Sequence, residues 1–243
     1  MESFWLSAFE AYLFNSVDSD IFKLLEKEYI KAISYLNSTE SKKKLFVNIN
    51  KRLPEYLIIA YVYNVYDNKI IDQFFSQAPI SAKTRAFDFI GGVIFSEENL
   101  KKNKGKINFE RIQLLLEERL KNKEKEELKK FGWWFVNSPF KKKWNIKKLY
   151  EILQVTNGEI EGAHQVIEKL KEYVESYPLL VVKSLFLIIE GNKKSWEVYY
   201  KKEELKGIIS VLLSKGKNVG KEAKKLINML VERGFLEFKE LLS

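Results

Sequence analysis

The chain has 243 residues, of which 46% are apolar and 14% aromatic, so we expect a folded protein with a buried core and not a disordered chain. It contains no cysteine, which excludes disulfide bonds and thiolate metal sites. The formal net charge is +9, from 42 lysines and arginines against 33 aspartates and glutamates.

The chain shows no targeting or membrane signal. Its first residues carry an acid, Glu2, and no basic cluster, so they do not predict a secretory signal. The most apolar stretches, residues 57–65 and 179–189, are shorter than the roughly 20 residues that a membrane-spanning helix needs. We therefore expect a cytoplasmic protein with no membrane partner.

Positive charge is concentrated in the middle of the chain. Residues 1–100 hold 11 basic and 13 acidic residues, residues 101–148 hold 16 and 6, and residues 149–243 hold 15 and 14. A local excess of this kind is typical of a surface that meets a polyanion. However, the chain has 37 lysines and only 5 arginines, and a lysine-rich composition without function gives the same balance.

In the first hundred residues, apolar side chains recur every three to four positions, which is the spacing of amphipathic helices. The pattern predicts helices over residues 4–13, 21–36, 53–66, 67–77 and 80–95. We expect Pro54 to mark the entrance of the third of these helices. The pair Gly91-Gly92 lies late in the last one, where it permits close packing or a bend.

Residues 101–106, with the sequence KKNKGK, are the predicted loop and boundary. This loop separates an N-terminal helical part, residues 1–100, from a C-terminal helical part, residues 107–243. The alternative is that both parts belong to one continuous domain.

After the loop the helical spacing is more regular. It predicts helices over residues 107–123, 126–137, 144–156, 162–176, 179–190, 203–214, 219–233 and 236–242. Asn157-Gly158 is a typical helix C-cap, and Pro178 precedes another helix start. Two helices begin about 40 residues apart, near Pro178 and Val219, a period found in HEAT-like repeats. We therefore predict an all-α fold of helical hairpins stacked as a short HEAT-like α-solenoid, with an irregular compact α bundle as the alternative.

The sequence lacks the residue clusters that catalysis requires. Its single histidine, His164, has no second histidine to share a metal with and is expected to be a packing or surface residue. Acidic pairs such as Glu126-Glu127 lie among lysines, which indicates solvated ion pairs on helix faces. Residues 216–221 are one residue short of a phosphate loop, and Glu222 stands where serine or threonine is needed. We predict no enzymatic activity, no cofactor and no metal site.

The most unusual segment combines aromatic and basic residues over positions 131–144. It contains three of the five tryptophans. One interpretation is a hydrophobic joint between the two halves of the chain. The other is an exposed surface, since tryptophan is frequent in protein interfaces, and aromatic rings stack on bases while lysines hold phosphates. The candidate binding residues are Trp133, Trp134, Lys141, Lys142, Lys143 and Trp144.

The second half of the chain resembles a known family. The residues that carry the resemblance are FGWWFVNSPF (131–140), Trp144 with Leu149 and Leu153, EYVESYPLLVVKSLFLIIEG (172–191), Trp196, and LINMLVERGFLEFKELL (226–242). Together, residues from about 130 to 243 are similar to the HEAT-like C-terminal helical region of bacterial NTPase-like proteins of the STAND/NACHT type and their defence-related relatives. The resemblance implies a sensor or scaffold arm, either as the C-terminal piece of a larger protein or as a stand-alone relative. Nothing in the chain resembles the ATPase module.

Helical-repeat DNA glycosylases offer a weaker resemblance, because they are of comparable length and place tryptophans and an aspartate around a damaged base. Here no aspartate follows Asp88, which removes the expected catalytic acid.

The sequence thus leads to three functional hypotheses. The first is a non-catalytic protein-interaction scaffold or sensor arm built from helical repeats, with a protein as its partner. The second is a nucleic-acid-binding module that uses the basic and aromatic residues 101–148, and the third is a glycosylase-like enzyme.

Overall fold

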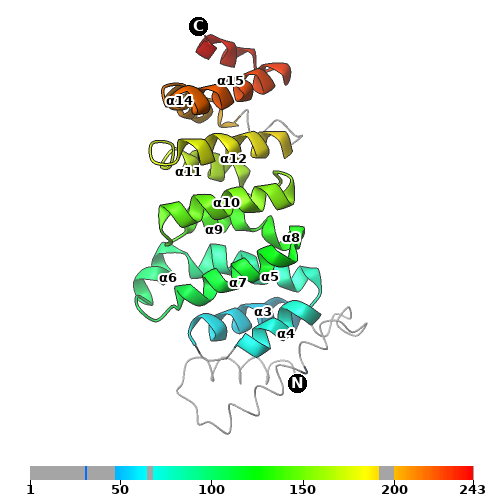
Figure 1. Ribbon diagram of the computed structural model, residues 1–243. Coiled ribbons are helices and arrows are strands. Elements are labelled where there is room, and N and C mark those ends of the chain that lie inside the picture. The colour runs from blue at the N-terminus through cyan, green and yellow to red at the C-terminus, as the bar shows by residue number, and fades with distance from the viewer. Residues whose placement is uncertain (1–30, 32–46, 65–67, 192–199, 243) are drawn as a thin grey trace. The chain divides into compact units, whose positions relative to one another are not determined.

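A computed structural model describes residue 31 and residues 47–64, 68–191 and 200–242 (Figure 1). All regular secondary structure in these ranges is helical, which confirms the all-α prediction. The predicted helix 4–13 and Trp196 lie outside the described residues, as does nearly all of the predicted helix 21–36. No helix in the described part of the chain is long and apolar enough to cross a bilayer.

The chain forms two compact units, unit 1 from Met1 to Asn122 and unit 2 from Lys123 to Ser243. This division falls after the predicted boundary loop. Lys101 and Lys102 of that loop belong to the end of a helix, and the turn begins at Asn103.

Unit 1 is a group of helices packed around aromatic side chains. Its described elements are α3 (Val47–Val62), α4 (Asn68–Gln77), α5 (Ile80–Phe89), the π-helix η3 (Ile90–Ile94), α6 (Glu97–Lys102) and α7 (Phe109–Asn122). Helix α3 contacts α4, α5 and α7. Phe75 packs edge-on against both Phe74 (5.0 Å between ring centroids) and Phe87 (6.0 Å) and so joins α4 to α5.

Two expectations for unit 1 need correction. Pro54 does not mark a helix entrance but lies inside α3, which begins at Val47. The proline ring costs the helix one amide hydrogen bond, and burial of the surrounding apolar side chains in the core offsets that loss. The predicted helix 80–95 is not α-helical throughout, because it widens into the π-helix at Ile90. The pair Gly91-Gly92 lies in this wider turn, with Gly91 buried and Gly92 exposed.

Unit 2 consists of helical hairpins in two layers. Its described elements are α8 (Lys125–Leu128), α9 (Phe131–Asn137), α10 (Lys142–Thr156), α11 (Ala163–Leu170), α12 (Pro178–Gly191), α14 (Lys202–Leu213), α15 (Lys217–Glu232) and the 3-10 helix η4 (Leu236–Leu242). Helices α9, α11 and α14 contact one another in sequence and form one layer, while α10, α12 and α15 form the second. Figure 1 shows the hairpins α9–α10, α11–α12 and α14–α15 following one another within this unit.

Helices α10 and α12 run in the same direction. Near their starts, the Lys142 Nζ donates to the backbone carbonyl of Glu172, 3.0 Å away and shortly before α12. Their ends meet so closely that a Cβ at Gly191 would lie 2.3 Å from the carbonyl oxygen of Asn157. The predicted C-cap is confirmed, since Asn157 ends α10 in the left-handed conformation (φ 56°).

Helices α12 and α15 are also parallel. Lys215, which precedes α15, forms an ion pair with Glu175, which precedes α12. At the opposite ends, the Arg233 guanidinium donates to the carbonyls of Ile189 and Glu190. All three helices of this layer therefore begin on the same side of unit 2.

The predicted helix 126–137 is broken into α8 and α9. The Lys129 carbonyl accepts a hydrogen bond from the Glu161 amide (2.9 Å), so it pairs with a loop rather than with the following helical turn. Glu127 was expected to be solvated, but it is fully buried, whereas its neighbour Glu126 is exposed and pairs with Lys129 (2.6 Å). Helical spacing alone does not reveal which of two adjacent acids faces the core.

Candidate binding surface

The candidate residues lie on both sides of the turn that joins α9 to α10. Helix α9 ends at Asn137, and the Phe140 amide donates to the Ser138 Oγ at 3.1 Å, which turns the chain. Lys141 then holds the N-cap position of α10, and Lys142 and Lys143 form its first turn. All three lysines are exposed. They do not stabilise α10, because the start of a helix carries the positive end of its dipole.

Trp144 is a half-buried aromatic beside these lysines. Its ring packs edge-on against that of Phe140, which precedes the N-cap, with 4.6 Å between ring centroids. The two rings leave part of their surface exposed next to the lysine side chains.

Lys142 is held against unit 2 by two contacts. In addition to its bond to the Glu172 carbonyl, its Nζ lies 5.5 Å from the centre of the Tyr173 ring. The buried Asn145 amide nitrogen donates to the Tyr173 hydroxyl at 2.9 Å and to the Phe135 carbonyl at 3.1 Å. Burial raises the pKa of the Tyr173 hydroxyl above its ordinary value of 10.0, although the Asn145 hydrogen bond opposes this shift.

The two remaining candidates, on α9, differ in burial. Trp134 is fully buried, with its ring 6.0 Å from that of Phe131, so it belongs to the core of unit 2 and is not available to a partner. Trp133 is half-buried, and its ring lies beside Gly162. A Cβ added to that glycine would lie 3.4 Å from the nearest ring atom. The sequence did not separate these neighbours, because successive helical residues point about 100° apart and only packing decides which one faces inward.

Parallel stacking brings three hairpin turns to one side of unit 2. These turns are residues 138–141, 171–177 and 214–216, and we call them the turn edge, together with the first residues of α10 and α15. The turn edge collects lysines that are far apart in the sequence. Lys141 and Lys143 come from the first hairpin, Lys171 from the second and Lys217 from the third, and all four are exposed.

The acids of the turn edge are already paired. Glu172 accepts from the Lys169 Nζ at 2.9 Å, and Glu175 pairs with Lys215. Neither α10 nor α15 has an acid in its first turn, whereas α14, in the other layer, begins with Glu203 and Glu204. The lysines therefore dominate the potential of this edge.

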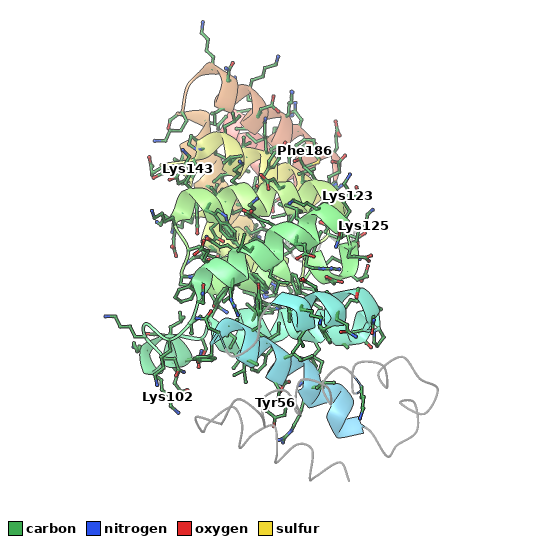
Figure 2. The ribbon with its side chains drawn as sticks, turned by 60° about the horizontal axis from the view of Figure 1, so that its bottom comes forward. Tyr56, Lys102, Lys123, Lys125, Lys143 and Phe186 are labelled. Carbon is green, nitrogen blue, oxygen red and sulfur yellow. The ribbon has the colours of Figure 1, made fainter. Side chains whose placement is uncertain are left out.

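A second surface lies on the outer side of α12, between α10 and α15. Leu179, Lys183, Phe186 and Glu190 follow helical spacing and form a stripe that we call the α12 stripe. Leu179 is 43% exposed and Phe186 is half-buried. The Lys183 Nζ lies 5.8 Å from the centre of the Tyr150 ring of α10. Figure 2 marks Phe186 on α12 and Lys143 on α10.

Sequence reasoning missed Lys171, Lys217 and the α12 stripe as candidate binding residues. The turn at 214–216 is visible as a break in the apolar pattern, but the turn at 171–177 is not, because the predicted helix 162–176 ends at Leu170 in the structure. Nothing in the sequence shows that these turns share one edge with residues 138–141. That proximity depends on the parallel stacking of α10, α12 and α15.

No group of three or more histidine, cysteine, aspartate or glutamate side chains in the described ranges could hold a metal ion. His164 is half-buried at the start of α11. Comparison of the chain with protein-family models, with curated proteins and with solved structures found no match.

Proposed function

We propose that this protein is a non-catalytic scaffold of HEAT-like helical hairpins that binds a protein partner through the α12 stripe. The two-layer, parallel arrangement of unit 2 supports the solenoid interpretation, because each described hairpin packs against the next one along the chain. As the resemblance expected for residues 130–243 implies, the proposal includes a role as a sensor or scaffold arm, working alone or as part of a larger NTPase-like protein.

The observation that carries the proposal is the composition of the α12 stripe. Leu179 and Phe186 expose apolar surface on the central helix of the layer, and they alternate along the stripe with the charged side chains Lys183 and Glu190. Protein interfaces likewise combine apolar contacts with polar and charged ones.

The proposal is tested by cross-linking in the native host, followed by identification of the captured proteins. The wild-type chain is compared with the double variant Leu179→Glu/Lys183→Glu. The matched control is Leu236→Glu, which places a charge at a side chain that is 67% exposed on η4. We expect the same proteins to be captured by the wild type and the control and lost from the double variant. If the double variant retains them, the α12 stripe is not the binding surface.

A further inference from the structure

We propose that the turn edge binds the phosphate backbone of a nucleic acid without sequence preference. This inference does not depend on the α12 stripe, because it concerns other residues and another side of unit 2.

The first argument is uncompensated charge. Lys141, Lys143 and Lys217 are exposed and form no ion pair within the described residues. The two acids of the neighbouring turn, Glu172 and Glu175, already have lysine partners. A polyanion therefore meets three free ammonium groups and no free carboxylate in these turns.

The second argument is the spacing of these lysines. Packed helices lie about 8–10 Å apart, so the starts of α10, α12 and α15 span roughly 20 Å along the stack. A stacked strand with the rise of a duplex strand, about 3.4 Å per phosphate, places about six phosphates along this length, and a more extended single strand places fewer. Lys141 and Lys143 lie on the first hairpin and Lys217 on the third, with the exposed Lys171 between them on the second. A ligand with a series of charges matches this arrangement better than one with a single anionic group.

The third argument is the aromatic side chains between the lysines. Phe140, Trp144 and Tyr177 are half-buried at the same edge, so each ring is held in place and keeps some exposed surface. Unpaired bases stack on rings of this kind. Single strands are therefore the expected ligand, in preference to duplexes whose bases are already stacked.

The absence of arginine from the turn edge determines the expected selectivity. Specific reading of guanine uses bidentate contacts, which arginine makes most often. Lysines that act as point charges hold phosphates without reading the bases. An acidic protein segment is a less suitable ligand, because protein interfaces need an apolar centre and the residues that define this edge are mainly lysines around half-buried rings.

The test is a fluorescence-anisotropy titration of the full chain with labelled 20-nucleotide single-stranded DNA, RNA and duplex DNA at 50 and 200 mM salt. The decisive variant is Lys141→Gln/Lys143→Gln/Lys217→Gln. The matched control is Lys69→Gln/Lys224→Gln/Lys239→Gln, which removes the same charge from three exposed lysines that lie outside the turn edge and outside residues 101–148. Thermal unfolding monitored by circular dichroism verifies that both variants keep the wild-type fold.

We expect single strands to bind and the affinity to fall steeply with salt. The turn-edge variant should weaken binding at least about tenfold at 50 mM salt. It should also reduce the magnitude of the slope of log K against log salt, where K is the association constant, by about 2. Each lost phosphate contact on a single strand accounts for about 0.7 of this slope. The control variant should bind like the wild type, and changing the base sequence should have little effect.

Three results would overturn the inference. The first is an absence of binding to any nucleic acid at 50 mM salt. The second is an equal loss of affinity in both triple variants, which would show a general effect of charge. The third comes from a parallel titration with polyglutamate. If polyglutamate binds the wild type but not the turn-edge variant, and nucleic acids do not displace it, the edge binds an acidic protein instead.

Discussion

At the scale of single residues, the glycines of unit 2 show how closely its parts are packed. A Cβ at Gly132 would lie 1.8 Å from the Glu161 carbonyl oxygen, so α9 approaches the loop before α11 with no room for a side chain. Gly207, in the middle of α14, has no atom within 4 Å of the same position.

These two glycines lead to opposite predictions for the same substitution. Gly132→Ala should lower the free energy of unfolding by about 3 kcal/mol, because the backbone must move apart. Gly207→Ala should raise it by about 0.5–1 kcal/mol, because alanine has the higher helix propensity. Urea denaturation followed by circular dichroism measures both changes. If Gly132→Ala left the free energy of unfolding unchanged, the close approach of α9 to the Glu161 carbonyl would not be maintained in solution.

Tyr61 is the titrating residue of unit 1 with the clearest environment. Its hydroxyl donates to the Arg111 carbonyl at 3.1 Å, and the Arg111 guanidinium donates to the Tyr61 carbonyl at 3.1 Å. Burial raises the pKa of Tyr61 from 10.0 to about 12, although the nearby Arg111 charge opposes this shift.

This shift predicts a loss of stability at high pH. The buried hydroxyl stays neutral in the folded chain. Its full contribution to the free energy of unfolding is therefore present below pH 10, where the unfolded tyrosine is also neutral. It is lost as the pH rises from 10 to about 12, by an amount on the order of 2 kcal/mol. Absorbance titration at the tyrosinate band should show a transition near pH 12 that Tyr61→Phe removes. Removal of a transition near pH 10 instead would contradict the prediction.

At the scale of helices, Arg233 connects the ends of two parallel elements. It follows the last residue of α15 and donates to the carbonyls of Ile189 and Glu190, in the last turn of α12, where backbone carbonyls lack helical partners. This contact fixes the end of α12 against α15.

We expect Arg233→Ala to destabilise unit 2 by about 1 kcal/mol, because both carbonyls lose a charged donor. Arg233→Lys should recover part of this loss, since one ammonium replaces the two-pronged guanidinium. Lys239→Ala, at an exposed position on η4, is the control and should change stability by less than about 0.5 kcal/mol. Equal effects at residues 233 and 239, measured by thermal unfolding, would mean that the cap has no energetic role.

At the scale of the whole molecule, the division between Asn122 and Lys123 predicts two folding units. Residues 123–243 expressed alone should be helical by circular dichroism and unfold cooperatively, because the hairpins of this unit bury their apolar faces against one another. Gly132→Ala should destabilise this fragment as much as the full chain. A fragment without a cooperative transition would show that unit 2 depends on unit 1.

The sequence by itself was sufficient for the helical class, most of the helix positions in unit 2 and the C-cap at Asn157. These features depend on local spacing and local backbone preferences, which adjacent residues carry. It was misleading where tertiary contacts override local preference. Glu127 looked solvated but is buried, Pro54 looked like a helix start but lies inside α3, and one predicted helix is divided into α8 and α9.

The candidate binding surface was only partly predictable for the same reason. Lys141, Lys142, Lys143 and Trp144 were found as a local run of basic and aromatic residues, but the run did not show that Trp134 turns inward. Lys217 lies more than seventy positions later in the chain. Local spacing determined that these segments form helices. The parallel stacking of α10, α12 and α15 decided which lysines share an edge, because long-range packing sets the position of each hairpin turn.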